Sequence, residues 1–206
     1  MVYVKICGIT NVRDARVAAR LGADALGFNF FKGSPRYIKP ARAKAIIAAL
    51  PPFTTTVGVF VDAAPEDILE ICRLCNLDAV QLHGRETPSQ VSAVRGVRRI
   101  KAIRVQSERD IETCPRYHVD AYLLDAYVPG EFGGTGEQFN WALAREAARF
   151  GPIILAGGLT PDNVAEAIET AAPYAVDVAS GIETAPGRKN KSAMAEFIRR
   201  AKAIGI

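Results

Sequence analysis

Short apolar runs and longer amphipathic segments alternate along the whole chain. The first run, Val2–Cys7, alternates β-branched with other side chains and stops at Gly8, which predicts a strand. Asn11 then offers a side-chain oxygen that can cap a helix near residues 12–21. The same unit recurs about every 25 residues, so the pattern predicts eight pairs of strand and helix.

The other strands are expected at the apolar runs that follow the first helix. They lie at residues 25–30, 54–61, 79–83, 99–105, 121–125, 153–156 and 175–179. The other helices are expected at residues 41–50, from Pro65, from Pro88, from Glu108, at residues 141–150, from Pro161 and at residues 192–203. Proline at the start of several helices fits the first helical turn, where a missing N–H costs nothing.

Eight such units predict one (β/α)8 TIM-barrel domain that spans residues 1–206. Near-continuous apolar runs such as residues 152–156 suit strands that are buried on both faces. The alternative is an open, doubly wound sheet. It is disfavoured because no strand is followed by a GxGxxG turn with an acidic residue some 20 positions later.

The composition is that of an ordinary globular protein, with 49% apolar and 23% charged residues. The formal net charge of +4 suits a small anionic substrate and gives no reason to expect a nucleic acid partner. No apolar stretch reaches the length of about 18 residues that spans a membrane, and the first strand begins at residue 2. We therefore expect a cytoplasmic protein without a membrane partner. Monomer and homodimer both remain open.

The 4 cysteines are too few to form a disulfide framework in a chain of this size, which fits a reducing compartment. Cys72 and Cys75 have CxxC spacing, which is also found in metal and redox sites. The apolar residues around them predict a helix interior instead, and no second pair of ligands is near. We expect both thiols to pack in the core.

In a parallel barrel, chemistry is placed at the carboxyl ends of the strands. Cys7 ends the first strand, and Lys5 lies on the same strand face, where its ammonium group favours the thiolate form that accepts a proton. Asp125 ends the sixth strand beside apolar residues, and burial favours the protonated carboxyl that can donate a proton. These residues are candidates for a catalytic base and acid. The alternatives are a packed thiol and a loop-anchoring carboxylate.

Glycine-containing turns end strands seven and eight, at the two places where many such barrels hold a phosphate group. Bare backbone at such turns lets several N–H groups reach phosphate oxygens. A third glycine-rich stretch at residues 133–136 can complete this phosphate-binding site. The residues expected at the phosphate are Gly134, Gly136, Gly157, Gly158, Ser180 and Gly181.

Two further polar residues lie at strand ends. Asp177 is on strand eight, which neighbours strand one in a closed barrel, so we expect an ion pair with Lys5. His83 ends strand four and either binds substrate, stacks on an aromatic ring or is satisfied within its loop. The second histidine, His118, falls in a helix–strand connection at the opposite face, so no metal site is expected.

Eight short motifs occur in order between residue 3 and about residue 190. They are Lys5–Thr10, Ser34–Tyr37, Val57–Val61, Gln81–Gly84, Leu124–Asp125, Gly133–Gly136, Leu155–Leu159 and Asp177–Glu183. Together they resemble the motifs of the phosphoribosylanthranilate isomerases of the tryptophan pathway. The resemblance implies an Amadori rearrangement of N-(5-phosphoribosyl)anthranilate, with a phosphorylated anionic substrate and neither cofactor nor metal.

The resemblance also implies roles for individual residues. Cys7 would be the general base and Asp125 the general acid, while Arg36 would hold the anthranilate carboxylate. We expect His83 and Asp177 to contact the substrate as well. Two alternatives remain: an aminoaldose isomerase of histidine biosynthesis, which usually has an aspartate where this chain has Cys7, and a catalytically silent barrel that binds phosphorylated ligands or a partner enzyme.

Overall fold

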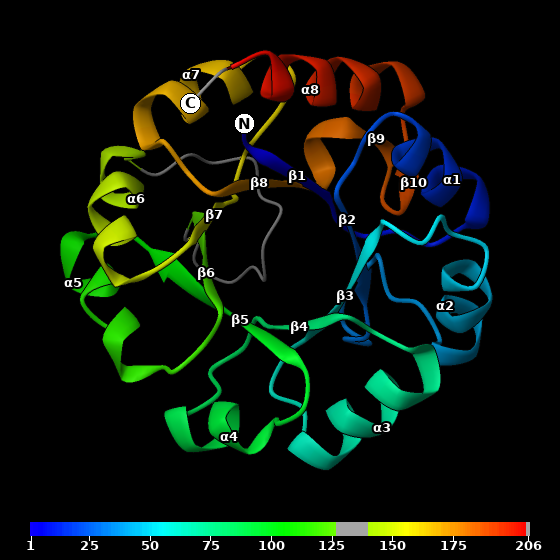
Figure 1. The fold of residues 1–206 in the computed structure, drawn as a ribbon, viewed down its shortest axis with the longest axis horizontal. Helices are drawn as coiled ribbons and strands as arrows, with labels where there is room; N and C mark the ends of the chain where they lie inside the picture. Colours follow the sequence, from blue (N-terminus) through cyan, green and yellow to red (C-terminus); the bar gives the residue numbers. More distant parts are fainter. Residues whose placement is uncertain (127–139, 205–206) are drawn as a thin grey trace.

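The computed structural model describes residues 1–126 and 140–204. Eight parallel strands, β1 to β8, close into a barrel in chain order, and helices surround it (Figure 1). The predicted (β/α)8 architecture is therefore confirmed. The open sheet is excluded because β1 pairs with both β2 and β8.

The strands begin and end within one residue of their predicted positions. They are β1 (Tyr3–Ile6), β2 (Ala25–Asn29), β3 (Thr55–Phe60), β4 (Ala79–Leu82), β5 (Arg98–Val105), β6 (Ala121–Ala126), β7 (Ile153–Leu155) and β8 (Ala175–Val178). Alternation along each strand sends one set of side chains into the barrel and the other toward the helices. The agreement in position therefore also fixes which residues face the interior.

The helices follow the expected order. They are α1 (Val12–Arg20), α2 (Pro40–Ile47), α3 (Pro65–Cys75), α4 (Pro88–Ala93), α5 (Glu108–Ile111), α6 (Ala142–Ala147), α7 (Val164–Ala171) and α8 (Lys191–Ala203). Asn11 caps α1 by accepting a hydrogen bond from the backbone N–H of Asp14. The prediction that Pro161 starts a helix is wrong, because Asn163 accepts from the N–H of Thr160 and donates to Gly158, which holds a turn before α7.

Several short elements were not predicted. They are the 3-10 helices η1 (Cys114–Arg116) and η3 (Ser180–Ile182) and the hairpin strands β9 (Glu183–Ala185) and β10 (Arg188–Lys189). The 3-10 helix η2 (Ala148–Phe150) forms the end of the helix expected at residues 141–150. The hairpin turns at Gly187, whose φ of 75° favours glycine. Its strands are short and polar, so they carry no hydrophobic alternation that would reveal them in the sequence.

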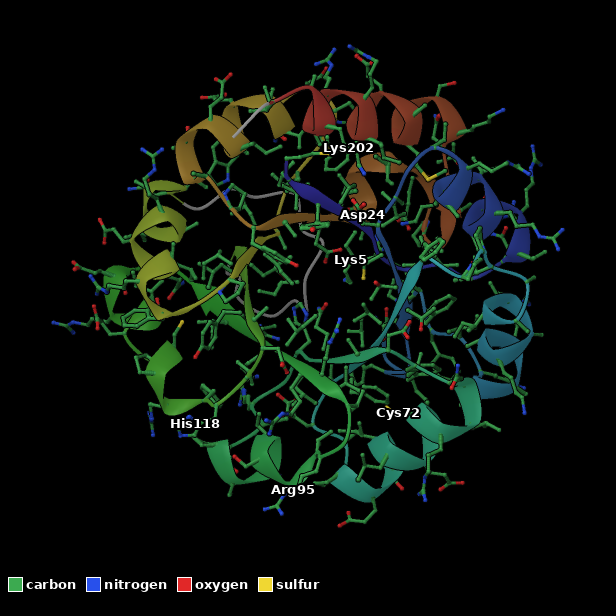
Figure 2. The ribbon with its side chains drawn as sticks, viewed as in Figure 1. Lys5, Asp24, Cys72, Arg95, His118 and Lys202 are labelled. Atoms are coloured by element: carbon green, nitrogen blue, oxygen red, sulfur yellow. The ribbon has the colours of Figure 1, made fainter. Side chains whose placement is uncertain are left out.

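Two apolar clusters hold the fold together. The larger one lies between the strands and the surrounding helices and includes Cys72, Cys75 and Cys114, which confirms core packing for the CxxC pair. The smaller one fills the barrel interior with Val57, Ala79, Ile100, Ala102, Ala121, Leu123, Ile154, Ala156 and Ala175. Lys5 lies within the ring of strands, whereas Cys72 and His118 lie among the outer elements (Figure 2). In the part of the chain that is described, no helix is both long and apolar enough to cross a membrane.

Candidate active site

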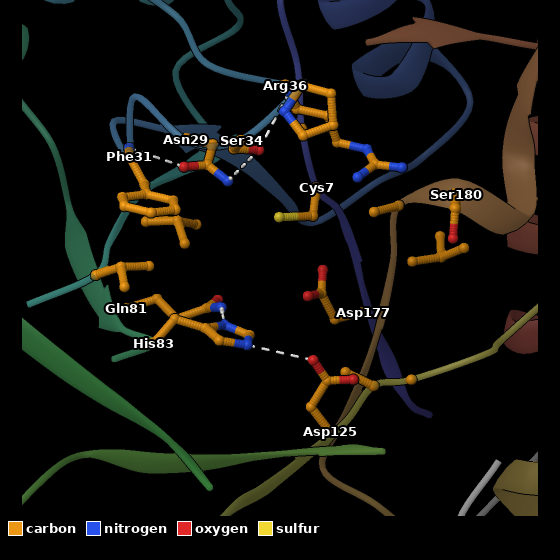
Figure 3. A pocket seen from close by; sticks show the side chains of 18 of the residues that line it. Cys7, Asn29, Phe31, Ser34, Arg36, Gln81, His83, Asp125, Asp177 and Ser180 are labelled. Carbon is orange, nitrogen blue, oxygen red and sulfur yellow. Dashed lines mark hydrogen bonds and ion pairs between the residues drawn. The ribbon is translucent and has the colours of Figure 1, made fainter. Parts of the chain in front are cut away.

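A cavity of about 450 Å³ opens at the carboxyl ends of the strands. Most of the predicted site residues line it, and Cys7, Arg36, His83, Asp125, Asp177 and Ser180 are seen together in Figure 3. Gly157 and Gly158 also line it. Two further predicted residues, Gly134 and Gly136, lie outside the described residues. Closure of the barrel therefore brings eight of the predicted residues, from strands and loops far apart in the sequence, to one cavity.

Cys7 continues β1 into the cavity. Its backbone N–H donates to the carbonyl of Val178 at 2.8 Å, which extends the pairing of β1 with β8. Gly27 on the neighbouring strand makes room for the thiol, because a Cβ there would lie 2.7 Å from Cys7 Sγ and 3.2 Å from Lys5 Nζ. Any larger residue at Gly27 would therefore displace both polar groups.

Lys5 and Asp177 form the ion pair predicted from the closed barrel. Lys5 Nζ lies 3.0 Å from Asp177 Oδ1, and the two residues are only 3% and 8% exposed. Burial alone lowers the pKa of Lys5, but the nearby Asp177 and Cys7 outweigh it, so the pKa of Lys5 is raised. Lys5 therefore stays charged beneath the thiol.

The pKa of Cys7 is raised, which corrects the expectation that its surroundings favour the thiolate. Burial is the largest cause, and the Asp177 carboxylate adds to it. The ammonium groups of Lys5 and Lys189 lower the pKa of Cys7, as expected, but their effect is smaller than that of burial and Asp177 together. The thiol is thus the main form near neutral pH, and the thiolate, once formed, is a strong base.

Alkylation of Cys7 by iodoacetamide is expected to accelerate with pH, with a midpoint above the ordinary cysteine value of about 8.5. Only the thiolate reacts, so a raised pKa moves the rise to higher pH. Burial raises the pKa of Cys72 to about 11 and of Cys114 to about 12, which keeps these thiols unreactive. The rate is measured by mass spectrometry against a Cys7→Ser control. A midpoint near pH 7 would show that the lysines affect the pKa of Cys7 more than burial and Asp177 do.

Asp125 lies at the end of β6 and is 5% exposed. Its Oδ2 is 3.2 Å from Nε2 of His83, and the other ring nitrogen of His83 is 2.6 Å from Nε2 of Gln81 (Figure 3). His83 is thus hydrogen-bonded to the candidate acid, a contact that the sequence did not predict. Gln81 was missed as a site residue, although it shares the face of strand β4 with His83 in one of the recognised motifs.

Arg36 is held by Glu183, a site residue that sequence reasoning missed. Arg36 Nε lies 3.0 Å from Glu183 Oε1, and Nη2 lies 2.8 Å from Oε2, a bidentate contact. Burial by itself raises the pKa of Glu183, but the hydrogen bonds from Arg36 and the charge of Lys189 outweigh it, so the pKa is lowered. Glu183 is the last residue of the motif Asp177–Glu183, so the sequence could have indicated it as a site residue. Lys189 lies outside the eight motifs.

The predicted phosphate site comprises the turns after β7 and β8. Gly157 and Gly158 have φ angles of 84° and 65°, a region that side chains disfavour. A Cβ on Gly181 would lie 2.0 Å from the carbonyl oxygen of Leu159, so the two loops pack backbone against backbone. Ser180 begins η3 directly beside them. Phosphate binding by these residues stays a prediction.

Among residues 1–126 and 140–204, no group of three or more His, Cys, Asp or Glu side chains is placed to hold a metal ion. A thiol and a carboxyl group that line one cavity can each exchange a proton with a bound molecule, and the neighbouring arginine suits an anion.

Comparison with known proteins gives one consistent result. A family model for N-(5'-phosphoribosyl)anthranilate (PRA) isomerase matches residues 4–200. The chain is 56% identical to such an isomerase from Geobacter sulfurreducens, over 98% of this chain and 99% of the relative. The crystal structure of the isomerase from Thermotoga maritima superimposes with a TM-score of 0.93 at 43% identity, and covers 99% of this chain and 100% of that chain.

A second similar structure holds a ligand. It is a phosphoribosylanthranilate isomerase in complex with reduced 1-(o-carboxyphenylamino)-1-deoxyribulose 5-phosphate. Its TM-score is 0.90 at 41% identity, with 99% of this chain and 100% of that chain covered. The name of that ligand includes a carboxyphenyl group and a 5-phosphate.

Proposed function

The chain belongs to the N-(5'-phosphoribosyl)anthranilate isomerase family of tryptophan biosynthesis, and from this premise we propose that it works by general acid–base catalysis with Cys7 as base and Asp125 as acid. The observation that carries the proposal is that this thiol and this carboxyl group line one cavity, directly after β1 and near the end of β6. The substrate is N-(5-phosphoribosyl)anthranilate and the product its 1-deoxyribulose isomer.

The first step opens the furanose ring. Asp125 donates its proton to the ring oxygen while the anilino nitrogen supplies an electron pair to C1, so that the C1–O bond breaks and an iminium ion forms. The Asp125 carboxylate left behind accepts a hydrogen bond from His83, which stabilises the negative charge as it develops. The substrate provides its own electron sink.

The second step moves the proton at C2. The iminium ion makes this proton acidic, and Cys7 removes it in its thiolate form, which is the minor form near neutral pH, to give an enolamine. The enolamine becomes the ketone when C1 gains a proton and the C2 hydroxyl group loses one. Lys5 is held by Asp177, so its ammonium group stays in place beside Cys7 while the thiol changes its charge.

We also propose that the enzyme acts in the cytoplasm, where reducing conditions keep Cys7 as the free thiol seen in the structure.

The two anionic ends of the substrate bind at opposite sides of the cavity in this proposal. Arg36 holds the anthranilate carboxylate, since Glu183 occupies its Nε edge and leaves the Nη1 edge for a second carboxylate. The phosphate binds at Gly157, Gly158, Ser180 and Gly181. Binding at both ends fixes the ring between the acid and the base.

Replacing Arg36 by alanine is expected to raise KM for the substrate by about tenfold or more and to change kcat much less. The guanidinium contacts the anthranilate group, which keeps its charge throughout the reaction, so the loss falls mainly on binding. Steady-state kinetics compares Arg36→Ala with Arg36→Lys, which keeps the positive charge but loses the planar guanidinium group. An unchanged KM in both variants would remove Arg36 from the binding site.

Turnover of phosphoribosylanthranilate, generated in place and followed by the loss of its anthranilate fluorescence, tests the proposed function directly. The purified protein is expected to convert it without added metal or cofactor. A protein that binds a substrate analogue but gives no turnover would contradict the proposed chemistry, and the aminoaldose of histidine biosynthesis would then be the next substrate to try.

We further propose that the enzyme is a homodimer. The T. maritima relative is described as dimeric. In this chain Tyr3, Phe53 and Tyr174 are 48%, 97% and 52% exposed, and all three precede or begin strands, at the face opposite the cavity. Burying such side chains against a second copy would contribute favourable apolar contact. Light scattering after gel filtration decides between dimer and monomer.

A further inference from the structure

A chain of hydrogen bonds crosses the barrel interior from β1 to the candidate acid. Lys5 Nζ donates to Gln81 Oε1 at 2.9 Å. Gln81 Nε2 lies 2.6 Å from His83 Nδ1, and His83 Nε2 lies 3.2 Å from Asp125 Oδ2 (Figure 3). The chain ends on the carboxyl group that the proposed function makes the general acid.

The first hydrogen bond, from Lys5 to Gln81, determines which atoms donate and which accept in the others. An ammonium group has three donors and no acceptor, so Lys5 requires the oxygen of Gln81 and turns the amide nitrogen toward His83. Lys5 is itself fixed by Asp177 at 3.0 Å. The orientation of Gln81 is therefore decided by a charge and not by a choice between similar atoms.

The second link determines the tautomer of His83. The amide nitrogen of Gln81 can only donate, so Nδ1 of His83 must accept and carries no proton. Rotating the ring by half a turn would place carbon atoms against Gln81 and Asp125 and lose both contacts. The remaining ring proton is on Nε2, which donates to Oδ2 of Asp125.

The tautomer matters because His83 would do opposite things in its two neutral forms. With the proton on Nε2, His83 donates to Oδ2, stabilises the carboxylate and leaves Oδ1 to carry the proton that goes to substrate. With the proton on Nδ1, Nε2 is a base that accepts the proton of Asp125 and withholds it from the ring oxygen. Only the first form suits an acid.

We propose that Gln81 is a positioning residue, which keeps the proton of His83 on Nε2 so that Asp125 can deliver its own proton to the substrate. Gln81 is 1% exposed, and the oxygen and nitrogen of its amide are engaged by Lys5 and His83. It thus acts through His83. The proposal rests on the proposed role of Asp125 as acid, but the tautomer can be measured without any turnover.

Nitrogen-15 chemical shifts of the histidine rings test the proposal in the wild-type protein. The chain has 2 histidines, and His118 is exposed on the other face of the barrel, so it serves as an internal reference. We expect His83 to have a protonated Nε2 and an unprotonated Nδ1 near neutral pH, whether or not the sample is active. A proton on Nδ1 would overturn the proposal, while inactivity alone would count only against the proposed function.

Two substitutions link the tautomer to catalysis. Gln81→Glu replaces the donor by an acceptor of the same shape, so Nδ1 is expected to gain a proton and kcat to fall by about 10- to 100-fold, with KM within about twofold. Gln81→Met removes both contacts and is expected to give a mixture of tautomers and a smaller loss of kcat. A protonated Nδ1 in Gln81→Glu with wild-type kcat would overturn the proposal. If that variant does not fold, the wild-type spectrum and Gln81→Met still decide it.

Discussion

Replacing Cys7 by serine is expected to lower kcat by at least about 100-fold while KM stays within about a factor of two. The hydroxyl group is smaller than the thiol and fits the space left by Gly27, so the surrounding residues can keep their positions. A serine hydroxyl is, however, far harder to deprotonate and cannot take the C2 proton. The loss falls on kcat because the base acts only in the transition state.

The matched control is Cys72→Ser, which makes the same chemical change in α3, outside the barrel. Its kcat is expected to remain at the wild-type value, even where a buried hydroxyl lowers the melting temperature. Fluorescence kinetics at saturating substrate measures both variants. A Cys7→Ser enzyme with nearly normal kcat would show that another group removes the C2 proton.

Replacing Asp125 by asparagine is expected to lower kcat by about 10²- to 10⁴-fold. The amide oxygen of asparagine can still accept the hydrogen bond from His83, so the side chain keeps its place beside β4. It has no acidic proton to give to the ring oxygen. The ring then opens only at the rate that the anilino nitrogen and solvent allow.

The control for this change is Asp120→Asn, at the amino end of β6. Asp120 is exposed and accepts from the backbone N–H of Arg99 at 2.8 Å, a contact that an asparagine oxygen also makes. Its kcat is expected to be unaffected. If Asp125→Asn kept a wild-type kcat as well, the acid would have to be another group in the cavity, and His83 is its nearest polar neighbour.

The positions of the strands depend on short stretches of sequence. The recurrence of apolar runs and amphipathic segments predicted eight strands to within one residue, because alternation and capping depend on neighbours in the chain. The strand ends then identified Cys7, Asp125 and Asp177, since closure of a parallel barrel brings all such ends together. The hairpin of β9 and β10 escaped prediction because its short polar strands bury no apolar face.

The contacts between these residues follow from the three-dimensional fold and not from local sequence. The contacts of Arg36 with Glu183 and of His83 with Asp125 join residues 147 and 42 positions apart, and no local pattern specifies them. The direction of the shift in the pKa of Cys7 also reversed the expectation drawn from Lys5 alone. The physical reason is that burial and the charge of Asp177, which comes from the far end of the chain, outweigh the lysines, and such a balance depends on distances in space.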